Sequence, residues 1–212
     1  MNQDLISPAL QTFMVLSLLG LIPSMLIMLS SFTRVIIVLS ILRTALGLQQ
    51  TPPNSVLINL ALFLTLFTMM PVAKVIYTQA YQPYDAHLIT TKTALNRAAK
   101  PLKKFMLQQT RDKDLQTMVQ LAKEPMPSSK ADIKLYQLVP AFLLSEIHTA
   151  FQIGFIIFLP FLLVDLIVSG ILMTMGMMMM PPMSISLPIK ILLFVLIDGW
   201  QLVVQALVGS FN

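Results

Sequence analysis

The chain has 212 residues, of which 56% are hydrophobic and only 11% charged, and its mean hydropathy is +0.80. A soluble domain usually holds about 45–50% apolar and about 25% charged residues, so this composition excludes a soluble globular protein and favours a membrane protein with several spans. The net charge is +5 and there is no cysteine, which excludes disulfides, thiol catalysis and cysteine-ligated metals.

Two apolar blocks occupy the first third of the chain. The first runs from Ala9 to Leu29 and continues from Val35 to Leu42, and the second runs from Val56 to Tyr77. Each is long enough to cross a bilayer, so residues 1–79 are predicted to form membrane helices. No basic residue precedes the first block, and no secretory signal is visible: either there is none, or it was cleaved and lies outside this numbering.

A polar stretch follows, which we interpret as a small helical domain outside the membrane over residues 80–137. Apolar residues recur at helical spacing in Thr93 to Leu107 and in Asp114 to Lys123, and residues 124–130 form a proline-containing loop. Ten of the fourteen Lys and Arg residues lie between Lys92 and Lys134, interleaved with acids. This mixed charge is typical of a solvated segment, so no nucleic-acid partner is expected.

Residues 138–212 return to apolar sequence. A third block runs from Leu138 to Met180 and a fourth from Ile189 to Val208. The third is long enough for about two spans and is interrupted by Pro160, so it could form a bent helix, a helical hairpin or one rod. No alternating strand pattern or internal repeat is visible. The predicted fold class is therefore all-α: membrane-associated helical hairpins with a small helical insertion.

Topology follows from the distribution of charge. The connection from Ser30 to Asn54 carries Arg34 and Arg43 and no acid, which favours the cytoplasm. Four spans would then place the polar domain and both termini on the periplasmic side. The bases of the polar domain oppose this only weakly, because long loops cross largely regardless of charge.

Ionisable side chains inside apolar blocks each cost about 2.5–3.5 kcal/mol at the centre of a span. Lys74 lies near the end of its block and can reach the interface. Four others need partners on other helices or other subunits: Glu146, Asp165, Lys190 and Asp198. Asp165 could instead bond Ser169 one turn later. A proton relay is the functional rival, but His148 lies two residues from Glu146 and so faces another side of the helix.

The run from Met173 to Met183 is the most unusual segment. Its Gly176 and Pro181-Pro182 prevent a regular helix, so the methionines are expected in a loop between two membrane helices. Methionine often fills core gaps or faces lipid. The alternative is a flexible hydrophobic gasket that closes a pore, formed by Met175, Met177, Met178, Met179 and Met180. Phe142, Glu146, Ala150 and Gly154 share one helical face, where a second helix could approach closely.

Several long and specific motifs are distributed along the chain. They are SFTRVIIVLS (31–40), LRTALG (42–47), PPN (52–54), ALFLT (61–65), SEI (145–147), AFQIGF (150–155), PFLLVD (160–165), GMMMMPP (176–182), SLPIK (186–190) and LIDGW (196–200). Through these motifs most of the chain resembles the FliP/SctR family of type III export-apparatus proteins. Pro52-Pro53-Asn54 and Ala80-Tyr81-Gln82-Pro83 resemble the flagellar branch more than the injectisome branch, as do residues 105–106 and 109–111.

The resemblance implies a ring of five copies in the bacterial inner membrane, at the flagellar basal body. The ring would join FliQ-like, FliR-like and FlhB-like subunits and conduct unfolded flagellar proteins, with Met177 to Met180 narrowing the pore. Neighbouring subunits would cover much of the apolar surface, and lipid the remainder. The resemblance implies no cofactor, and energy would come from the proton gradient and a separate ATPase.

Three other functions are alternatives for this sequence. The injectisome counterpart would have the same architecture with different substrates. A stand-alone transporter or channel usually shows internal repeats. An intramembrane enzyme would need a nucleophile, acid–base or metal-ligating set, and the residues offer none with suitable spacing, so no enzymatic activity is expected.

Overall fold

A computed structural model describes residues 10, 12–14, 16–17, 20, 25, 27–123, 129–177 and 179–211. These residues form helices and turns without any strand, which confirms the all-α prediction. The helices in chain order are α2 (Phe32–Ala45), α3 (Asn54–Ile76), the π-helical turn η1 (Tyr77–Tyr81), α4 (Gln82–Asp85), α5 (Thr91–Gln109), α6 (Asp112–Leu121), the 3₁₀ turn η2 (Lys130–Asp132), α7 (Leu135–Thr174), α8 (Met183–Leu196) and α9 (Gly199–Gly209).

The second apolar block forms a longer helical segment than its composition indicated. α3, η1 and α4 follow one another without a break from Asn54 to Asp85, over 32 residues. The wider π-helical turn keeps the backbone bonded where the sequence becomes polar. The expected start of the polar domain at residue 80 therefore falls inside this helical segment.

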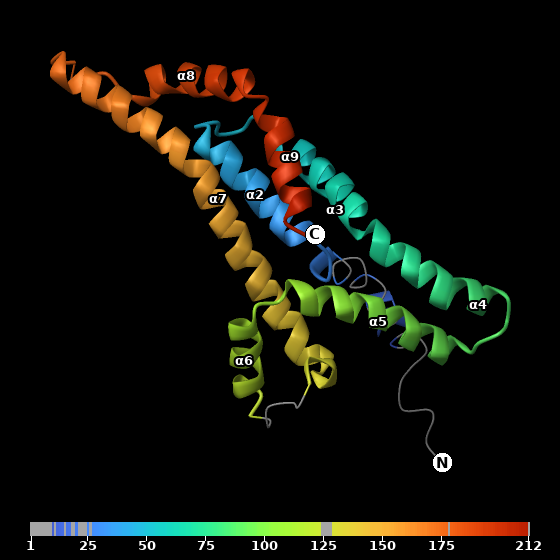
Figure 1. Cartoon of the computed structure of the whole chain (residues 1–212). Coiled ribbons are helices and arrows are strands. Elements are labelled where there is room, and N and C mark those ends of the chain that lie inside the picture. The colour runs from blue at the N-terminus through green and yellow to red at the C-terminus, as the bar shows by residue number, and fades with distance from the viewer. Residues whose placement is uncertain are drawn as a thin grey trace.

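The third block forms one continuous helix rather than a hairpin. α7 extends over 40 residues, or roughly 60 Å at 1.5 Å per residue. Both Pro140 and Pro160 lie inside it. A proline removes one backbone donor, but the residues around both prolines remain helical. Figure 1 shows α7 running the length of the molecule, from the polar layer to the corner where α8 begins.

The fourth apolar block, Ile189 to Val208, forms two helices and not one straight rod. α8 begins earlier, at Met183, and α9 leaves it at an angle of 66°. Asp198 has a φ of +50°, in the left-handed region that interrupts a helix and that Asp tolerates better than most residues. Gly199 comes next, and the Phe194 ring occupies the space that a Cβ there would need.

Two described helices are long and apolar enough to cross a membrane. They are the segment Asn54–Asp85 and α7, and the bent pair of α8 and α9 would make a third. α2 has only 14 residues. About half of the first block, from Ala9 to Leu29, lies outside the described residues, so the prediction of four spans concerns residues that the structure only partly describes.

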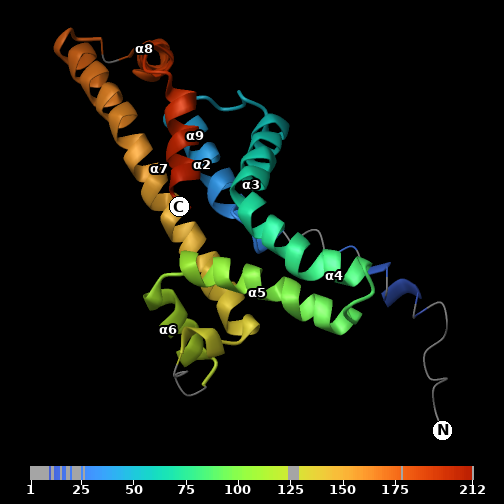
Figure 2. The same cartoon turned by 45° about the vertical axis from the view of Figure 1, so that its right-hand side comes forward.

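The main core surrounds α2, which lies between α3 and α7 (Figures 1 and 2). One face of α2 is fully buried at Val35, Val38, Leu39 and Leu42. A Cβ atom at Gly154 of α7 would lie 2.5 Å from Cδ1 of Ile41. The close helix approach predicted at Ala150 and Gly154 is therefore confirmed, and the approaching helix is α2.

A second core joins the polar helices to the beginning of α7. Phe105 and Met106 of α5 and Leu115 of α6 pack against Leu138 and Phe142. α5 and α6 correspond to the helices predicted at Thr93 to Leu107 and Asp114 to Lys123, while residues 124–128 of the predicted loop lie outside the description. In Figures 1 and 2, α5 crosses α7 at one end of the apolar helices.

The outer faces of the long helices remain apolar. The side chains of Phe63, Leu66 and Phe67 on α3 are 71%, 66% and 64% exposed, and Phe155 and Ile156 on α7 are similarly exposed. Isolated exposed apolar residues are ordinary, but continuous faces of this size normally contact lipid or other subunits. The outer faces of α3 and α7 are therefore suited to contact with lipid or with other subunits.

Candidate functional site

A methionine-rich turn follows directly on the end of α7. The amide of Met177 donates to the carbonyl of Leu172 at 2.9 Å, and the amide of Gly176 donates to that of Met173 at 3.1 Å. With Gly176 at a φ of +74°, these bonds form a Schellman cap. Glycine adopts this backbone conformation without strain, which explains why the helix ends at this position.

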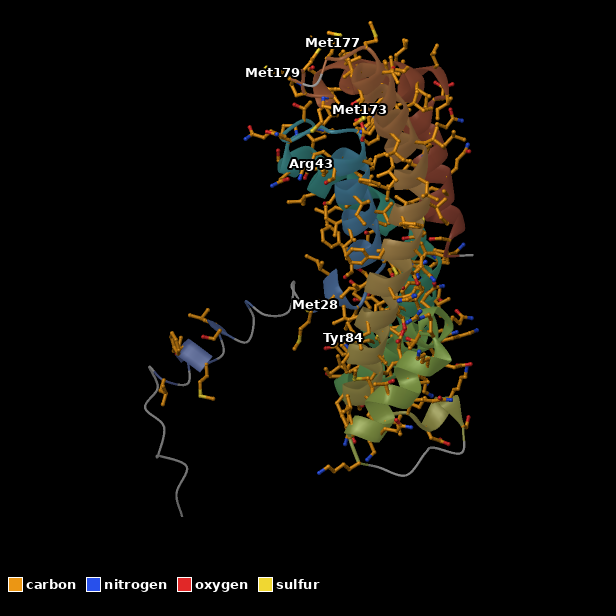
Figure 3. All side chains as sticks on the ribbon, turned by 90° about the vertical axis from the view of Figure 1, so that its left-hand side faces the viewer. Met28, Arg43, Tyr84, Met173, Met177 and Met179 are labelled. Atoms are coloured by element: carbon orange, nitrogen blue, oxygen red, sulfur yellow. The ribbon has the colours of Figure 1, made fainter. Side chains whose placement is uncertain are left out.

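The methionine turn presents thioether side chains at one extreme of the molecule. Met179 is 100% exposed and Met175 is 67% exposed, while Met177 and Met180 are 38% and 41% exposed. Figure 3 shows Met173, Met177 and Met179 at one end and Tyr84 toward the opposite end. Met178 lies outside the described residues. Flexible apolar side chains that project from a helix end can adapt to surfaces of varied shape.

An ion pair joins α7 and α8, the two helices that the methionine turn connects. Nζ of Lys190 lies 2.6 Å from Oδ2 of Asp165 and donates to the carbonyl of Ala45 at 3.1 Å. Ala45 ends α2, where helix carbonyls lack intrahelical partners and attract cations. Lys190 thus joins three helices, and its side chain is only 6% exposed. The buried Oδ1 of Asp165 has no hydrogen-bond partner among the described residues.

A second buried ion pair joins α2 to α7. The guanidinium of Arg34 donates from Nε to Oε2 of Glu146 at 3.0 Å and from Nη2 to Oε1. Its remaining donors reach Oε1 of Gln109 at 2.9 Å and the carbonyl of Ser210 at 2.9 Å. Its planar face also lies 3.9 Å from the centre of the Phe211 ring. Arg34 therefore holds parts of four segments together, including the polar helix α5 and the residues after α9.

Asp198 differs from the other three ionisable residues that the sequence singled out. It is exposed at the bend between α8 and α9, and none of the hydrogen bonds and ion pairs of the described residues involves its side chain. Its backbone carbonyl begins α9 by accepting from the amides of Gln201 and Leu202. The structure brings Asp165 and Lys190 together, and places Glu146 and Asp198 elsewhere.

Sequence reasoning missed the partners of these charges. Arg34 was interpreted only as a charge that sets topology, although its side chain is 2% exposed. In the sequence, Arg34 lies 112 residues before Glu146 and 75 residues before Gln109. The available signal was an arginine in an apolar helix of the same chain as an unexplained glutamate, a combination that predicts a buried pair.

A third polar network attaches α6 to α7. Arg111 donates through Nε to Oδ2 of Asp114 at 2.9 Å, and the Ser145 hydroxyl donates to the same carboxylate at 2.6 Å. The backbone amide of Arg111 donates to the Ser145 oxygen. The hydrogen bond from Arg111 holds the pKa of Asp114 below its ordinary value, assisted by Ser145, while burial opposes the shift.

Comparison with known protein sequences identifies the family of this chain. The sequence model of the FliP family matches residues 15–207. The chain belongs to the FliP family. This FliP-family chain is 49% identical over 203 residues to the flagellar biosynthetic protein FliP of Pectobacterium carotovorum subsp. carotovorum, covering 96% of this chain and 79% of that protein.

A second FliP relative has nearly the same length. The flagellar biosynthetic protein FliP of Bacillus subtilis is 49% identical over 206 residues, with 97% of this chain and 93% of that protein covered. Other FliP relatives are longer: the chain spans 56% of the FliP of Buchnera aphidicola subsp. Baizongia pistaciae, at 50% identity. The expected resemblance to this family is confirmed over most of the chain.

Among the described residues, no three or more Asp, Glu or His side chains are grouped so that they could hold a metal ion. Several buried polar residues of this FliP-family chain bond one another across helices. The features that remain available to another molecule are the methionine turn, the apolar outer faces and the basic surface of α5.

Proposed function

We propose that this chain is a structural, pore-forming subunit of the flagellar protein-export gate. It would conduct unfolded flagellar proteins across the bacterial inner membrane without catalysing a reaction. The observation that carries the proposal is the exposed methionine turn at the end of two apolar helices. An adaptable apolar ring is suited to a polypeptide pore, because it can close against water and still admit varied side chains.

The relatives supply the flagellar context, since they are named flagellar biosynthetic proteins. The continuous apolar faces of α3 and α7 support assembly with other subunits as well as contact with lipid. We propose a ring of five copies, associated with FliQ-like, FliR-like and FlhB-like subunits. Co-expression with such partners should give a detergent-extracted particle. Its mass should equal that of five copies of this chain plus the associated partner subunits. Recovery of only monomers from the co-expressing membranes would contradict the ring.

The pore is tested by changing the turn. Met177, Met179 and Met180 replaced together by serine should leave the particle assembled but raise the ion conductance of the membrane. The matched control replaces three other exposed methionines, Met14, Met28 and Met70. Unchanged conductance in the turn variant, or an equal increase in the control, would contradict the gasket.

We further propose that the polar helices face the periplasm and the α2–α3 connection faces the cytoplasm. Because the chain has no cysteine, single cysteines report topology cleanly. Gln116→Cys on α6 should react with a membrane-impermeant maleimide in cells whose outer membrane is permeabilised, whereas Gln50→Cys should react only after lysis. The reverse pattern would invert the topology.

A further inference from the structure

α5 carries a basic surface along one side. Its 19 residues include no Asp or Glu, and five bases: Lys92, Arg97, Lys100, Lys103 and Lys104. At 100° per residue these five fall within an arc of about 140° on the helix. The opposite face holds Phe105 and Met106, which are buried in the second core. α5 is thus an amphipathic helix with one side on which every charged residue is basic.

A cleft of about 400 Å³ separates this basic side from the end of α3. Its α3 wall is largely apolar and includes Pro71, Val72 and Val75, while the α5 wall brings Lys100, Lys104 and Gln108. No ion pair among the described residues involves Lys100 or Lys104. The cleft therefore combines an apolar wall with two ammonium groups that lack a carboxylate partner.

A second cavity, of about 950 Å³, adjoins the cleft along the same helix. Lys100, Lys104 and Gln108 line both. Two further bases that line this cavity have acidic partners: Arg111 pairs with Asp114, and Lys130 pairs with Asp112 at 2.5 Å. The unmatched charge is therefore concentrated at Lys100 and Lys104, where the cleft meets α3.

The residues around the cleft are of the kinds that occur at a membrane interface. α3 is apolar until Val72, and then Lys74, Tyr77, Tyr81 and Tyr84 follow along the continuing helical segment. The three tyrosines are exposed, and the rings of Tyr77 and Tyr81 stack with centroids 5.4 Å apart. Exposed tyrosines and a lysine after an apolar span mark the level of the lipid head groups. Lys100 and Lys104 lie beside this level.

We propose that the cleft between α3 and α5 binds an anionic phospholipid. The phosphate lies against the ammonium groups of Lys100 and Lys104, and an acyl chain runs along Val72 and Val75 toward the apolar face of α3. Attraction to anionic lipid contributes about 1 kcal/mol for each basic residue near a membrane surface. The inference concerns the single subunit and does not require that it form a pore.

A soluble polyanion fits the cleft less well. An acidic peptide or a nucleic acid would place charge against both walls, but on the wall opposite α5 only Gln79 offers a side-chain donor, while Pro71, Val72 and Val75 offer none. A phospholipid has the same division as the cleft, with a charged head and an apolar tail. The apolar wall also continues directly into exposed α3 side chains such as Met70, which is 61% exposed.

The test measures lipid binding to the purified full chain in mixed micelles of an uncharged detergent. A spin-labelled phosphatidylglycerol is titrated, with spin-labelled phosphatidylcholine as the uncharged reference. The chain should bind phosphatidylglycerol more tightly, and Lys100→Gln with Lys104→Gln should weaken that binding about thirtyfold. The matched control, Lys113→Gln with Lys123→Gln, removes two exposed lysines of the α6 region and should change it less than twofold.

A third variant tests the apolar wall without changing charge. Val75→Trp should fill the cleft and weaken phosphatidylglycerol binding, while circular dichroism verifies that the helices remain. Equal binding of both lipids, or equal weakening by the control pair, would overturn the site. Displacement of the lipid by polyglutamate at equimolar concentration would instead identify an acidic polypeptide site and also overturn the proposal. Membrane conductance does not enter this test, so its outcome is independent of the pore.

Discussion

Arg34 of α2 and Glu146 of α7 form a bidentate ion pair in the interior of the protein, although 112 residues separate them in the chain. Their side chains are 2% and 0% exposed. The arginine also contacts Gln109, Ser210 and Phe211. Because these residues come from the polar helix and from the segment after α9, the pair fixes how the polar and apolar layers meet.

Glu146→Ala should destabilise the subunit itself by about 3–5 kcal/mol, because Arg34 would remain buried without its carboxylate. Thermal unfolding in detergent, followed by circular dichroism, measures the loss. The double variant Arg34→Met with Glu146→Met removes both charges and should recover most of it. A stable Glu146→Ala subunit that only fails to assemble would show that the partner of Glu146 lies in another subunit.

Lys190→Met should loosen α8 from α7, because Asp165 and the carbonyl of Ala45 would both lose their donor. Spin labels on cysteines introduced at the exposed positions Leu163 and Leu192 report the spacing of these helices. In Lys190→Met we expect a broader distribution of the distance between these two labels. Adding Asp165→Asn to the same chain removes the carboxylate that has lost its partner and should narrow the distribution again. Lys74→Met, at an exposed lysine of α3, is the control. An unaltered distribution in Lys190→Met would show that apolar packing alone positions α8.

Gly154→Val should push α2 away from α7, since even a Cβ would lie 2.5 Å from Ile41. We expect a loss of about 1–3 kcal/mol, typical of overpacking. Ile41→Ala in the same chain should restore part of that stability by making room. Gly170→Val is the matched control, because no atom lies within 4 Å of a Cβ there. Equal effects at both glycines would point to helix propensity instead of contact.

The attachment of α6 should weaken in acid. The pKa of Asp114 is lowered in the folded chain, so between the folded and unfolded values the unfolded chain binds the proton more readily. The contribution is complete above the ordinary Asp pKa of about 3.9 and is lost as the pH falls through the lower folded value. The thermal unfolding midpoint should fall less steeply between pH 7 and pH 3 in Asp114→Asn than in the unaltered chain, because the variant is already destabilised at neutral pH. Parallel curves would show that other carboxylates carry the acid sensitivity.

The sequence predicted most of the helices but not how they are broken and joined. Regular spacing of apolar residues identified α5 and α6, and the small residues at 150 and 154 identified the side of α7 that receives α2. The break at Asp198 was missed because its signal is one backbone angle inside an apolar run. Conversely, Pro160 suggested an interruption that the continuous α7 does not show.

The candidate sites differed in the same way. Gly176 and the two following prolines made the methionine turn visible, because glycine and proline act locally on the backbone. The partner of Glu146 was not visible, because Arg34 is distant in the chain and belongs to another helix. The basic side of α5 was also missed: charge averaged over residues 80–137 looked mixed, whereas the acids lie outside Thr91–Gln109.

The length of α7 has a mechanical consequence. The helix is about twice as long as a typical 30 Å hydrocarbon layer is thick, and it connects the α6 attachment at Ser145 to the methionine turn beyond Thr174. From Ser145 to Thr174 the helix measures roughly 44 Å, and a rigid lever of that length converts a 5° tilt at one end into a displacement of roughly 4 Å at the other. Force applied to the polar helices could thus reposition Met177 and Met179 without any rearrangement within the turn.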